Sequence, residues 1–388
     1  RFVERFARYY TPAVTLGAVL VVVVPVVLFG QPFSTWLLRG LTLLVIACPC
    51  ALVISTPVSF VSAITSAARQ GVLIKGGVSL ERMADVRVMA FDKTGTLTHG
   101  RAEVTDVVPL ADLDRQQVLA IAAAVEARSE HPIGRAIVRA ADGAGVDLEV
   151  SEFESFPGRG ARARVDGVVH VVGRPGLSDV SDPVGELEAL AAEGKTPVVV
   201  VRVPDDGPRT VIAVLALTDP LRPAVPRAIS ELRRLGIERV VVLSGDLKQA
   251  AEEAGREAGA DDVWSRLEPA AKVEAIEALE AETGHVAMVG DGVNDAPALA
   301  AASVGIAMGA AASDAALETA DIAVMGDDLA RLPYLYLLAK RSKRVIRENI
   351  VAALVVKIVL AIGVPLGWVS LNVAVLIGDM GATLSVTA

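Results

Sequence analysis

Two long stretches near the start of the chain contain almost no charged residues. No Asp, Glu, Lys or Arg occurs from Tyr9 to Leu38, and after Arg39 the charge-free pattern continues from Gly40 to Ala68. About 20 apolar residues cross the hydrocarbon core of a bilayer. The pattern therefore predicts two membrane-spanning helices within residues 1–68, joined by a turn at Gly30-Gln31-Pro32.

The end of the chain repeats this pattern. From Ile350 onward only Lys357 and Asp379 are charged, and Pro365-Leu366-Gly367 divides the segment into a second predicted pair of spans, within residues 340–388. Basic residues cluster beside the spans at Arg1, Arg5, Arg8, Arg69, Lys75, Lys340, Arg341, Lys343, Arg344 and Arg347. Because basic residues favour the cytoplasmic side, the sequence predicts a multi-pass plasma-membrane protein whose middle and both ends are cytoplasmic. A buried core helix of a soluble protein is the alternative for such apolar runs.

Between the spans, strand-like apolar runs alternate with helical patterns. The runs are 86–91, 240–243, 286–289, 304–307 and 322–324, and the helical patterns are 224–235, 247–257 and 271–282. This alternation is typical of a doubly wound parallel sheet. Several of the runs end in acidic residues, and ligands of such sheets bind at the carboxyl ends of the strands. One site is therefore expected at that edge.

Residues 100–211 interrupt the alternation after its first strand. They contain helical patterns at 116–127 and 133–141, a hairpin signal at Asp166-Gly167 and a strand-like run at 197–203. We expect an inserted α+β domain that covers the site. The α/β domain is then built from residues 69–99, which include a connector, and residues 212–339.

Composition excludes some function classes. The chain has 388 residues, with 46 acidic and 37 basic ones and a net charge of −9, so a nucleic-acid binder is excluded by the lack of a basic footprint. Two cysteines exclude a disulfide scaffold. The chain begins with Arg1 and no signal-peptide pattern precedes the first apolar run, which leads us to expect part of a longer polypeptide.

The segment Asp92-Lys93-Thr94-Gly95-Thr96-Leu97-Thr98 directly follows a predicted buried strand. A carboxylate at a strand end, within a loop of glycine and threonine donors, can attack a phosphoryl group and hold it as an acyl phosphate. Phosphoryl transfer depends mainly on positioning and charge stabilisation. Lys272 can neutralise phosphate charge, and Asp291 can hold Mg²⁺ beside Asp92.

This segment resembles the phosphorylation motif of P-type ATPases. Further segments resemble motifs of the haloacid dehalogenase-like superfamily, to which the phosphorylation domain of those pumps belongs: Thr218-Asp219-Pro220, Ser244-Gly245-Asp246, Lys272, and Gly290 to Pro297 with Asp291, Asn294 and Asp295. The resemblance implies catalytic roles for Asp92, Lys93, Thr94, Thr218, Asp219, Ser244, Gly245, Asp246, Lys272, Asn294 and Asp295. It also implies a Mg²⁺ site formed by Asp92, Thr94 and Asp291. The alternative for Asp92 alone is a helix cap at the sheet edge.

In the inserted domain, Glu126, His131-Pro132 and Gly158-Arg159-Gly160 are similar to the nucleotide-binding signature of the heavy-metal branch of these pumps. The resemblance implies that Glu126 and His131 hold the adenine end of ATP, while Gly158 and Gly160 allow close backbone approach. Ala163 stands where family members often carry a third glycine. From the residues alone, a histidine before a proline is more often the first residue of a helix.

The only two cysteines form Cys48-Pro49-Cys50 in the middle of the second charge-free run. Proline removes a backbone donor and opens a membrane helix at this point. Cys-Pro-Cys resembles the signature of heavy-metal P-type ATPases, which implies that both thiolates bind the transported ion. Buried cysteines that only fill apolar space are the alternative.

Ionisable residues inside membrane spans are costly and are usually functional or paired. Asp379-Met380-Gly381 resembles the last-span motif of the zinc, cadmium and lead branch, and Lys357 resembles that branch's lysine in the preceding span. We hypothesise that Cys48, Cys50 and Asp379 bind the ion and that Lys357 is a countercharge for Asp379. A structural ion pair, or a lysine that reaches towards the membrane interface, is the alternative.

The implied function is ATP-driven export of Zn²⁺, Cd²⁺ or Pb²⁺ through an aspartyl-phosphate intermediate, with Mg²⁺ as cofactor. Two thiolates and a carboxylate suit a divalent, borderline-soft ion. Alternatives are a copper or cobalt pump of the same family, a membrane-anchored phosphohydrolase without transport, and a non-catalytic metal-binding subunit. The Tyr-Asn pattern of copper pumps and the Ser-Pro-Cys of cobalt pumps are not found in the spans.

P-type ATPases carry an actuator domain with a Thr-Gly-Glu motif before the phosphorylation motif, and heavy-metal pumps have further spans there. No such motif precedes Asp92 in this sequence. We therefore expect the chain to need an additional N-terminal part for a complete transport cycle.

Overall fold

The computed structural model describes residues 2–47, 50–129, 131–141, 148–156, 159–177, 183–246, 248–292, 295–309, 318–326 and 328–381. The chain divides into two compact units. One comprises Arg1–Asp85 and Tyr334–Ala388, and the other comprises Val86–Pro333.

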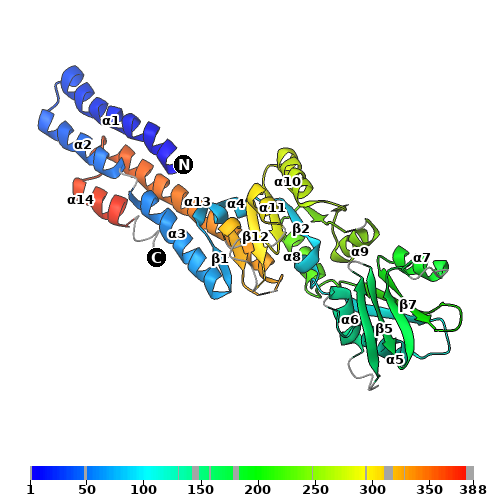
Figure 1. Cartoon of the computed structure of the whole chain (residues 1–388). Helices are drawn as coiled ribbons and strands as arrows, with labels where there is room; N and C mark the ends of the chain where they lie inside the picture. The colour runs from blue at the N-terminus through cyan, green and yellow to red at the C-terminus, as the bar shows by residue number, and fades with distance from the viewer. Residues whose placement is uncertain are drawn as a thin grey trace. The chain divides into compact units, whose positions relative to one another are not determined.

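The first unit consists mainly of long apolar helices, several of which run side by side (Figure 1). Its helices are α1 (Phe2–Phe29), α2 (Phe33–Ala47), α3 (Cys50–Arg69), α4 (Gly77–Met83), α13 (Arg331–Gly363), α14 (Leu371–Val373) and the π-helical segment Ala374–Gly381, and its strand is β1 (Val72–Ile74). Gly30 adopts φ +61° between α1 and α2, which confirms the predicted turn. A Cβ at Gly40 of α2 would lie 2.4 Å from Val22 Cγ2 of α1, so these two helices approach closely at a glycine.

Within the described residues, one helix is long and apolar enough to span a membrane by itself, at Pro12–Phe29 within α1. The second predicted span is described in two parts, α2 up to Ala47 and α3 from Cys50, and residues 48–49 lie outside the described residues. Helix α13 begins at Arg331, before the basic cluster at Lys340 to Arg347, and continues without a break to Gly363. The spans predicted beyond α1 therefore stay predictions.

The second unit contains a parallel sheet with the strand order β13-β12-β11-β2-β9-β10. The strands are β2 (Val88–Asp92), β9 (Arg239–Leu243), β10 (Asp262–Trp264), β11 (Val286–Gly290), β12 (Val304–Met308) and β13 (Ile322–Val324). Strands β2, β11, β12 and β13 are buried along their whole length, as expected for parallel strands covered on both faces. The five strands predicted for this sheet are confirmed, whereas β10 was not predicted.

Helices between the strands cover the sheet and complete its core. They are α8 (Val225–Leu235), α9 (Lys248–Ala258), α10 (Pro269–Thr283) and α11 (Ala296–Ala301). Ile276 and Leu279 of α10 and Leu299 of α11 pack with strand residues such as Val88 and Met288. This core fixes α10 against the strands that carry the candidate site.

An antiparallel sheet is inserted after β2 and has the strand order β3-β8-β7-β6-β5-β4 (Figure 1). Its elements are β3 (Glu103–Pro109), α5 (Arg115–Glu126), α6 (Pro132–Ala140), β4 (Val150–Phe156), β5 (Gly160–Val165), β6 (Val168–Gly173), α7 (Val184–Ala192), β7 (Thr196–Val203) and β8 (Thr210–Thr218). The predicted hairpin is confirmed, with φ of 47° at Asp166 and 79° at Gly167. The predicted boundary at residue 211 falls inside β8, because this strand stays in the antiparallel sheet until Thr218.

Candidate functional site

Three neighbouring parallel strands end at the same edge of the sheet and carry predicted site residues there. Strand β2 ends in Asp92, β9 is followed by Ser244-Gly245-Asp246, and β11 is followed by Asp291. Asp92 lies opposite Leu243 in the pairing of β2 with β9, and Phe91 lies opposite Val289 in the pairing of β2 with β11. The topology therefore gathers segments that lie far apart in the sequence.

Lys272 joins two of the predicted carboxylates. Its Nζ donates to Asp92 Oδ1 at 2.5 Å and to Asp295 Oδ1 at 2.6 Å. All three side chains are buried, with Asp295 only 1% exposed. Lys272 lies in the first turn of α10, and the packing of this helix on the sheet core keeps the ammonium at the strand ends.

Burial raises the pKa of Asp92 to about 7. The charges of Asp295 and Asp291 act in the same direction, against the Lys272 ammonium. Burial also raises the pKa of Asp295, whereas Lys272 lowers it. The pKa of Lys272 would be lowered by its burial, but the charges of Asp92 and Asp295 outweigh this effect and raise it. The cluster thus gathers acidic charge around one ammonium, and it favours an additional positive charge.

The residues after Asp92 form a tight loop, Lys93–Leu97. Thr94 has φ −78° and ψ 123°, and Gly95 has φ 78° and ψ −13°, which is the geometry of a type II turn with glycine at its third position. A Cβ at Gly95 would lie 3.1 Å from Asp291 Oδ2, so this glycine lets the Asp291 carboxylate approach the loop. Lys93 forms an ion pair with Asp246.

The other predicted catalytic residues lie in nearby connections. Asp219 accepts from Thr98 Oγ1 at 2.6 Å and from the Arg101 amide at 3.1 Å, in the passage between the two sheets, directly after Thr218. Ser244 is buried, and its Oγ accepts from the Asp246 amide at 3.1 Å. A Cβ at Gly245 would lie 3.3 Å from the Leu267 carbonyl oxygen. Asn294 lies outside the described residues.

The donor set at the sheet edge fits Mg²⁺. Magnesium binds through one or two carboxylates together with substrate phosphates and water, so it does not need a cage of protein ligands. Asp92 and Asp291 can offer carboxylate oxygens, with Asp291 lying against the Gly95 turn, and Thr94, which is exposed, can offer an oxygen atom. Within the described residues, no group of three or more His, Cys, Asp or Glu side chains suits a metal ion.

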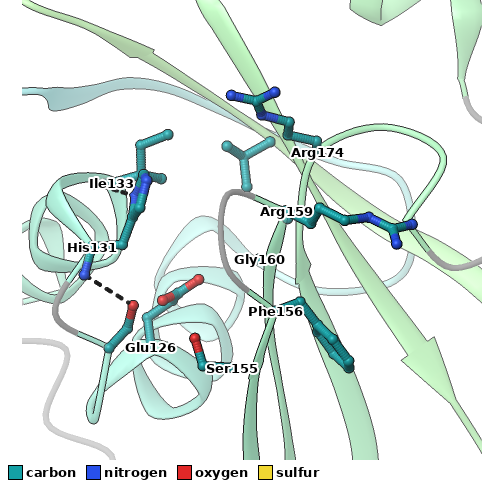
Figure 2. A pocket seen from close by; sticks show the side chains of 11 residues that line it. Glu126, His131, Ile133, Ser155, Phe156, Arg159, Gly160 and Arg174 are labelled. Atoms are coloured by element: carbon teal, nitrogen blue, oxygen red, sulfur yellow. Dashed lines mark hydrogen bonds between the residues drawn. The ribbon is translucent and has the colours of Figure 1, made fainter.

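A second candidate region is a small cavity of about 70 Å³ in the inserted domain (Figure 2). The helical side of the cavity carries Glu126 and His131, and the strand side carries Gly160, Arg159 and Arg174. The cavity is also lined by Ser129, Ile133, Ser155, Phe156, Gly173 and Val198. Of the predicted nucleotide-binding residues, Glu126, His131 and Gly160 therefore meet at one cavity, whereas Pro132 is not among the residues that line it.

His131 caps helix α6. Its Nδ1 accepts from the Ile133 amide at 3.3 Å, and Pro132 occupies the first turn of the helix. The cap uses one ring nitrogen, so the other ring nitrogen is left for a ligand. Burial raises the pKa of Glu126, although its bond with Ser129 and the charge of His131 oppose this effect. A helix cap and a ligand contact are thus compatible at His131.

Close backbone contacts form the strand side of the cavity. A Cβ at Gly160, which has φ +149°, would lie 2.2 Å from the Val172 carbonyl oxygen, and a Cβ at Gly173 would lie 2.3 Å from the Arg159 carbonyl oxygen. Gly158 lies outside the described residues. The sequence prediction missed Gly173 and Arg174, although the glycine at the end of an apolar run, just before Arg174-Pro175, was an available signal.

In the first unit, Lys357 of α13 contacts helix α2. Its Nζ donates to the Ile46 carbonyl oxygen at 2.9 Å, and both residues are buried. Ile46 is the second-last described residue of α2, and it precedes Cys48 by two positions in the sequence. Cys48 lies outside the described residues, and only the backbone is described for Cys50 and Asp379. The hypothesised contacts of these three side chains are not part of the described structure.

Comparisons with known proteins agree with this fold. Residues 86–303 match the model of the haloacid dehalogenase-like hydrolase family. A probable cadmium-transporting ATPase of Staphylococcus aureus (strain MRSA252) is 45% identical over 396 residues, covering 99% of this chain and 54% of that protein. A zinc/cadmium/lead-transporting P-type ATPase of Escherichia coli (strain K12) is 43% identical, covering 100% of this chain and 52% of that protein.

The crystal structure of a zinc-transporting PIB-type ATPase in the E2.Pi state is 42% identical and has a TM-score of 0.92. It covers 100% of this chain, and the match covers 63% of that protein. The chain thus spans about half the length of the curated relatives that it matches. The family model covers more than half of the chain, and the relatives match it along its whole length. The chain therefore belongs to the haloacid dehalogenase-like hydrolases and, among them, to the heavy-metal P-type ATPases.

Proposed function

We propose that the chain is the catalytic and ion-binding part of a pump that uses ATP to export Zn²⁺, Cd²⁺ or Pb²⁺ across the plasma membrane. The main observation in support is the buried Lys272, whose ammonium bonds both Asp92 and Asp295 at the strand ends. The printed names of the relatives, which include cadmium-transporting and zinc/cadmium/lead-transporting ATPases, support the choice of ions.

Asp92 is the proposed nucleophile. A carboxylate oxygen of Asp92 forms a bond to the γ-phosphorus of ATP while the bond from this phosphorus to the bridging oxygen breaks, and ADP leaves. Lys272 offsets the negative charge of the phosphoryl group, and Asp295 holds Lys272 in place. Mg²⁺, held by Asp92, Thr94 and Asp291, would supply the positive charge that keeps Asp92 ionised and neutralises the phosphate.

The cavity of the inserted domain is the proposed site for ATP. Glu126 and His131 would contact the adenine end, and the glycines of the strand side would allow the nucleotide to approach the backbone. The guanidinium groups of Arg159 and Arg174 are suited to polyphosphate oxygens, because arginine binds phosphate through two parallel hydrogen bonds. Arg174 is thus an additional candidate nucleotide ligand.

The proposed ion ligands are Cys48, Cys50 and Asp379, with Lys357 as the countercharge. Lys357 is buried in the first unit, and its Nζ donates to the Ile46 carbonyl oxygen of α2. Ile46 precedes Cys48 by two positions in the sequence. An ammonium at this position can balance the Asp379 carboxylate after the ion has left. The additional N-terminal part expected from the relatives would be needed for dephosphorylation and a complete cycle.

A phosphoenzyme assay tests the proposal. Purified chain in detergent is incubated with [γ-³²P]ATP and Mg²⁺, quenched in acid and analysed for bound label. We expect an acid-stable, hydroxylamine-sensitive phosphoenzyme that is lost in Asp92→Asn, because an amide cannot form an acyl phosphate. Asp112→Asn, which changes an exposed aspartate of the inserted domain, is the matched control and should keep the label. Label that persists in Asp92→Asn would contradict the assignment of the nucleophile.

A further inference from the structure

Arg222 is a buried arginine that binds the loop following Asp92. Its Nε donates to the carbonyl oxygens of Thr96 at 3.0 Å and Thr98 at 2.9 Å, and its Nη2 donates to the Gly95 carbonyl oxygen at 2.9 Å. Arg222 is 7% exposed, although it is always charged. Burying a cation is costly unless its donors are satisfied, so these carbonyl contacts are what makes the position tolerable.

The same segment is also joined to the loop through its backbone. The Arg222 amide donates to the Leu97 carbonyl oxygen at 2.8 Å, and Thr98 forms an isolated bridge with Leu221. Asp219 adds the bond from Thr98 Oγ1. The chain leaves the parallel sheet after β2 through this loop, and after β8 ends at Thr218 it passes Arg222 on its way to α8 and β9. Arg222 therefore links the return passage to the loop that begins at Asp92.

The guanidinium group can control the shape of this loop. In a trans peptide the carbonyl and the following amide point in opposite directions, so fixing the carbonyls of Gly95 and Thr96 also fixes the amides of Thr96 and Leu97. The turn at Thr94 and Gly95 lies directly before these peptides and against Asp291. A planar fork of donors can hold three carbonyls at once, whereas a lysine ammonium holds them with less directional control.

We propose that Arg222 is a positioning residue for phosphoryl transfer to Asp92. It holds the loop Gly95–Thr98 in the conformation that receives the phosphoryl group, and it connects this loop to the return passage of the inserted domain. Arg222 does not touch the reacting atoms in this role. The inference rests on the proposed function, because it concerns the same site.

The test compares wild-type chain, Arg222→Met, Arg222→Lys and Arg227→Met in detergent. Arg227 lies on α8 and pairs with Glu231 on the surface, so Arg227→Met is the matched control. We expect Arg222→Met to lower the rate of phosphoenzyme formation by at least about tenfold at saturating ATP, while the KM for ATP changes by less than about twofold, because misplaced reacting groups reduce the chemical step. Arg222→Lys should recover part of the rate, and Arg227→Met should match the wild type.

Hydrogen–deuterium exchange gives a readout that does not depend on catalysis. The amides of Thr96, Leu97 and Thr98 should exchange faster in Arg222→Met than in wild type, with exchange in β7 and β11 unchanged, which also shows that both sheets remain folded. A wild-type rate in Arg222→Met, or unchanged exchange of the loop, would overturn the positioning role. If Arg222→Met does not fold, the partial loss expected for Arg222→Lys decides the question by the same two measurements. If the wild type forms no phosphoenzyme but loop exchange still responds to Arg222, the proposed function fails while the control of the loop by Arg222 stands.

Discussion

At the scale of single residues, the surroundings of Asp92 make ionisation of its carboxyl group costly, although the proposed reaction needs the ionised form. The carboxyl lies at the end of a fully buried strand, and the nearby acidic residues add to the cost of ionising it. The ammonium of Lys272 offsets only part of this cost, since the pKa of Asp92 remains raised to about 7. In such a site, a bound cation would supply the missing positive charge. A phosphoryl group would then react with the ionised carboxylate.

This environment predicts how stability depends on pH when Mg²⁺ is removed with EDTA. The folded chain binds the Asp92 proton more tightly than the unfolded chain, whose aspartate pKa is about 3.8. The stabilising contribution is therefore complete at low pH and is lost as pH rises from about 4 through 7, by up to roughly 4 kcal/mol. In Asp92→Asn this loss should disappear, so the variant should become more stable than wild type at pH 8.

Thermal unfolding followed by tryptophan fluorescence measures this effect, because Trp264 of β10 packs on the core of the parallel sheet. The difference in unfolding midpoint between Asp92→Asn and wild type should increase from pH 5 to pH 8. Asp112→Asn serves as the control and should follow the wild type at each pH. An equal difference at both pH values would show that the burial of Asp92 does not control its protonation.

The sequence alone could identify the site residues that have a reactive side chain and belong to a motif with a recognisable spacing. Asp92, Lys272 and Asp295 belong to motifs that follow strands or lie in helices, and these motifs occur in a recognisable order along the chain. Arg222 could not be found in this way, because its partners are backbone carbonyls, and any residue type presents a carbonyl. Gly134 was missed for a related reason: a Cβ there would lie 2.4 Å from Glu126 Oε2, a contact that depends on how α6 packs beside α5.

At the scale of elements, the strand pair β5–β6 shapes one side of the cavity in the inserted domain. Gly160 and Gly173 lie opposite each other in this pair, so the two backbones meet without side chains at the edge of the cavity. Neither position has room for a methyl group. The pair therefore presents bare backbone to a ligand.

This geometry predicts a specific loss of nucleotide binding. A methyl group at Gly160 would overlap the Val172 carbonyl oxygen and would also strain a backbone with φ +149°, so β5 and β6 must move apart. We expect Gly160→Ala to weaken the binding of ATP by at least about tenfold, which corresponds to about 1.4 kcal/mol. Gly185→Ala in α7 is the control, because a Cβ there meets no atom within 4 Å and alanine favours helix. Isothermal titration calorimetry with ATP measures both; unchanged affinity of Gly160→Ala would argue against a nucleotide in this cavity.

Element prediction succeeded where hydrophobic patterns were long or continuous. The buried runs of β2, β9, β11 and β12 and the apolar stripe of α8 carry a strong pattern. Strands β1, β10 and β13 contain only three residues each, which is too short for a periodicity to appear, although the apolar run of β13 was predicted. Strand β4 has mostly exposed or half-buried residues and contains two glutamates, because it lies at the edge of the antiparallel sheet. These strands are determined by their neighbours rather than by their own sequence.

At the scale of the whole molecule, the catalytic sheet and the apolar helices belong to one chain that matches heavy-metal ATPases along its length. The proposed function requires both a phosphorylation site and ion ligands in the apolar helices, whereas an anchored phosphohydrolase would require only the phosphorylation site. The proposed ion ligands therefore have to bind metal with defined stoichiometry.

Metal binding tests this part of the proposal. Purified chain in detergent is dialysed against Zn²⁺ and the bound metal is measured by atomic absorption. We expect Cys48→Ala and Asp379→Ala each to reduce the bound zinc by about one ion per chain, because a tetrahedral site that loses one of few ligands binds much more weakly. Thr42→Ala, which removes only a bond to the Leu38 carbonyl within α2, is the control. Unchanged stoichiometry in both ligand variants would refute the assigned ion site.

The bond from Lys357 to the Ile46 carbonyl also bears on attempts to redesign the ion specificity. A lysine held by main chain keeps its position when side chains around it are replaced, so exchanging Asp379 or the cysteines for ligands of a monovalent ion would leave its positive charge beside the path. The path would then hold one cation too many for an ion that brings only a single charge. Conversion of the proposed pump into a copper(I) transporter should therefore begin with Lys357, before any proposed ligand is changed.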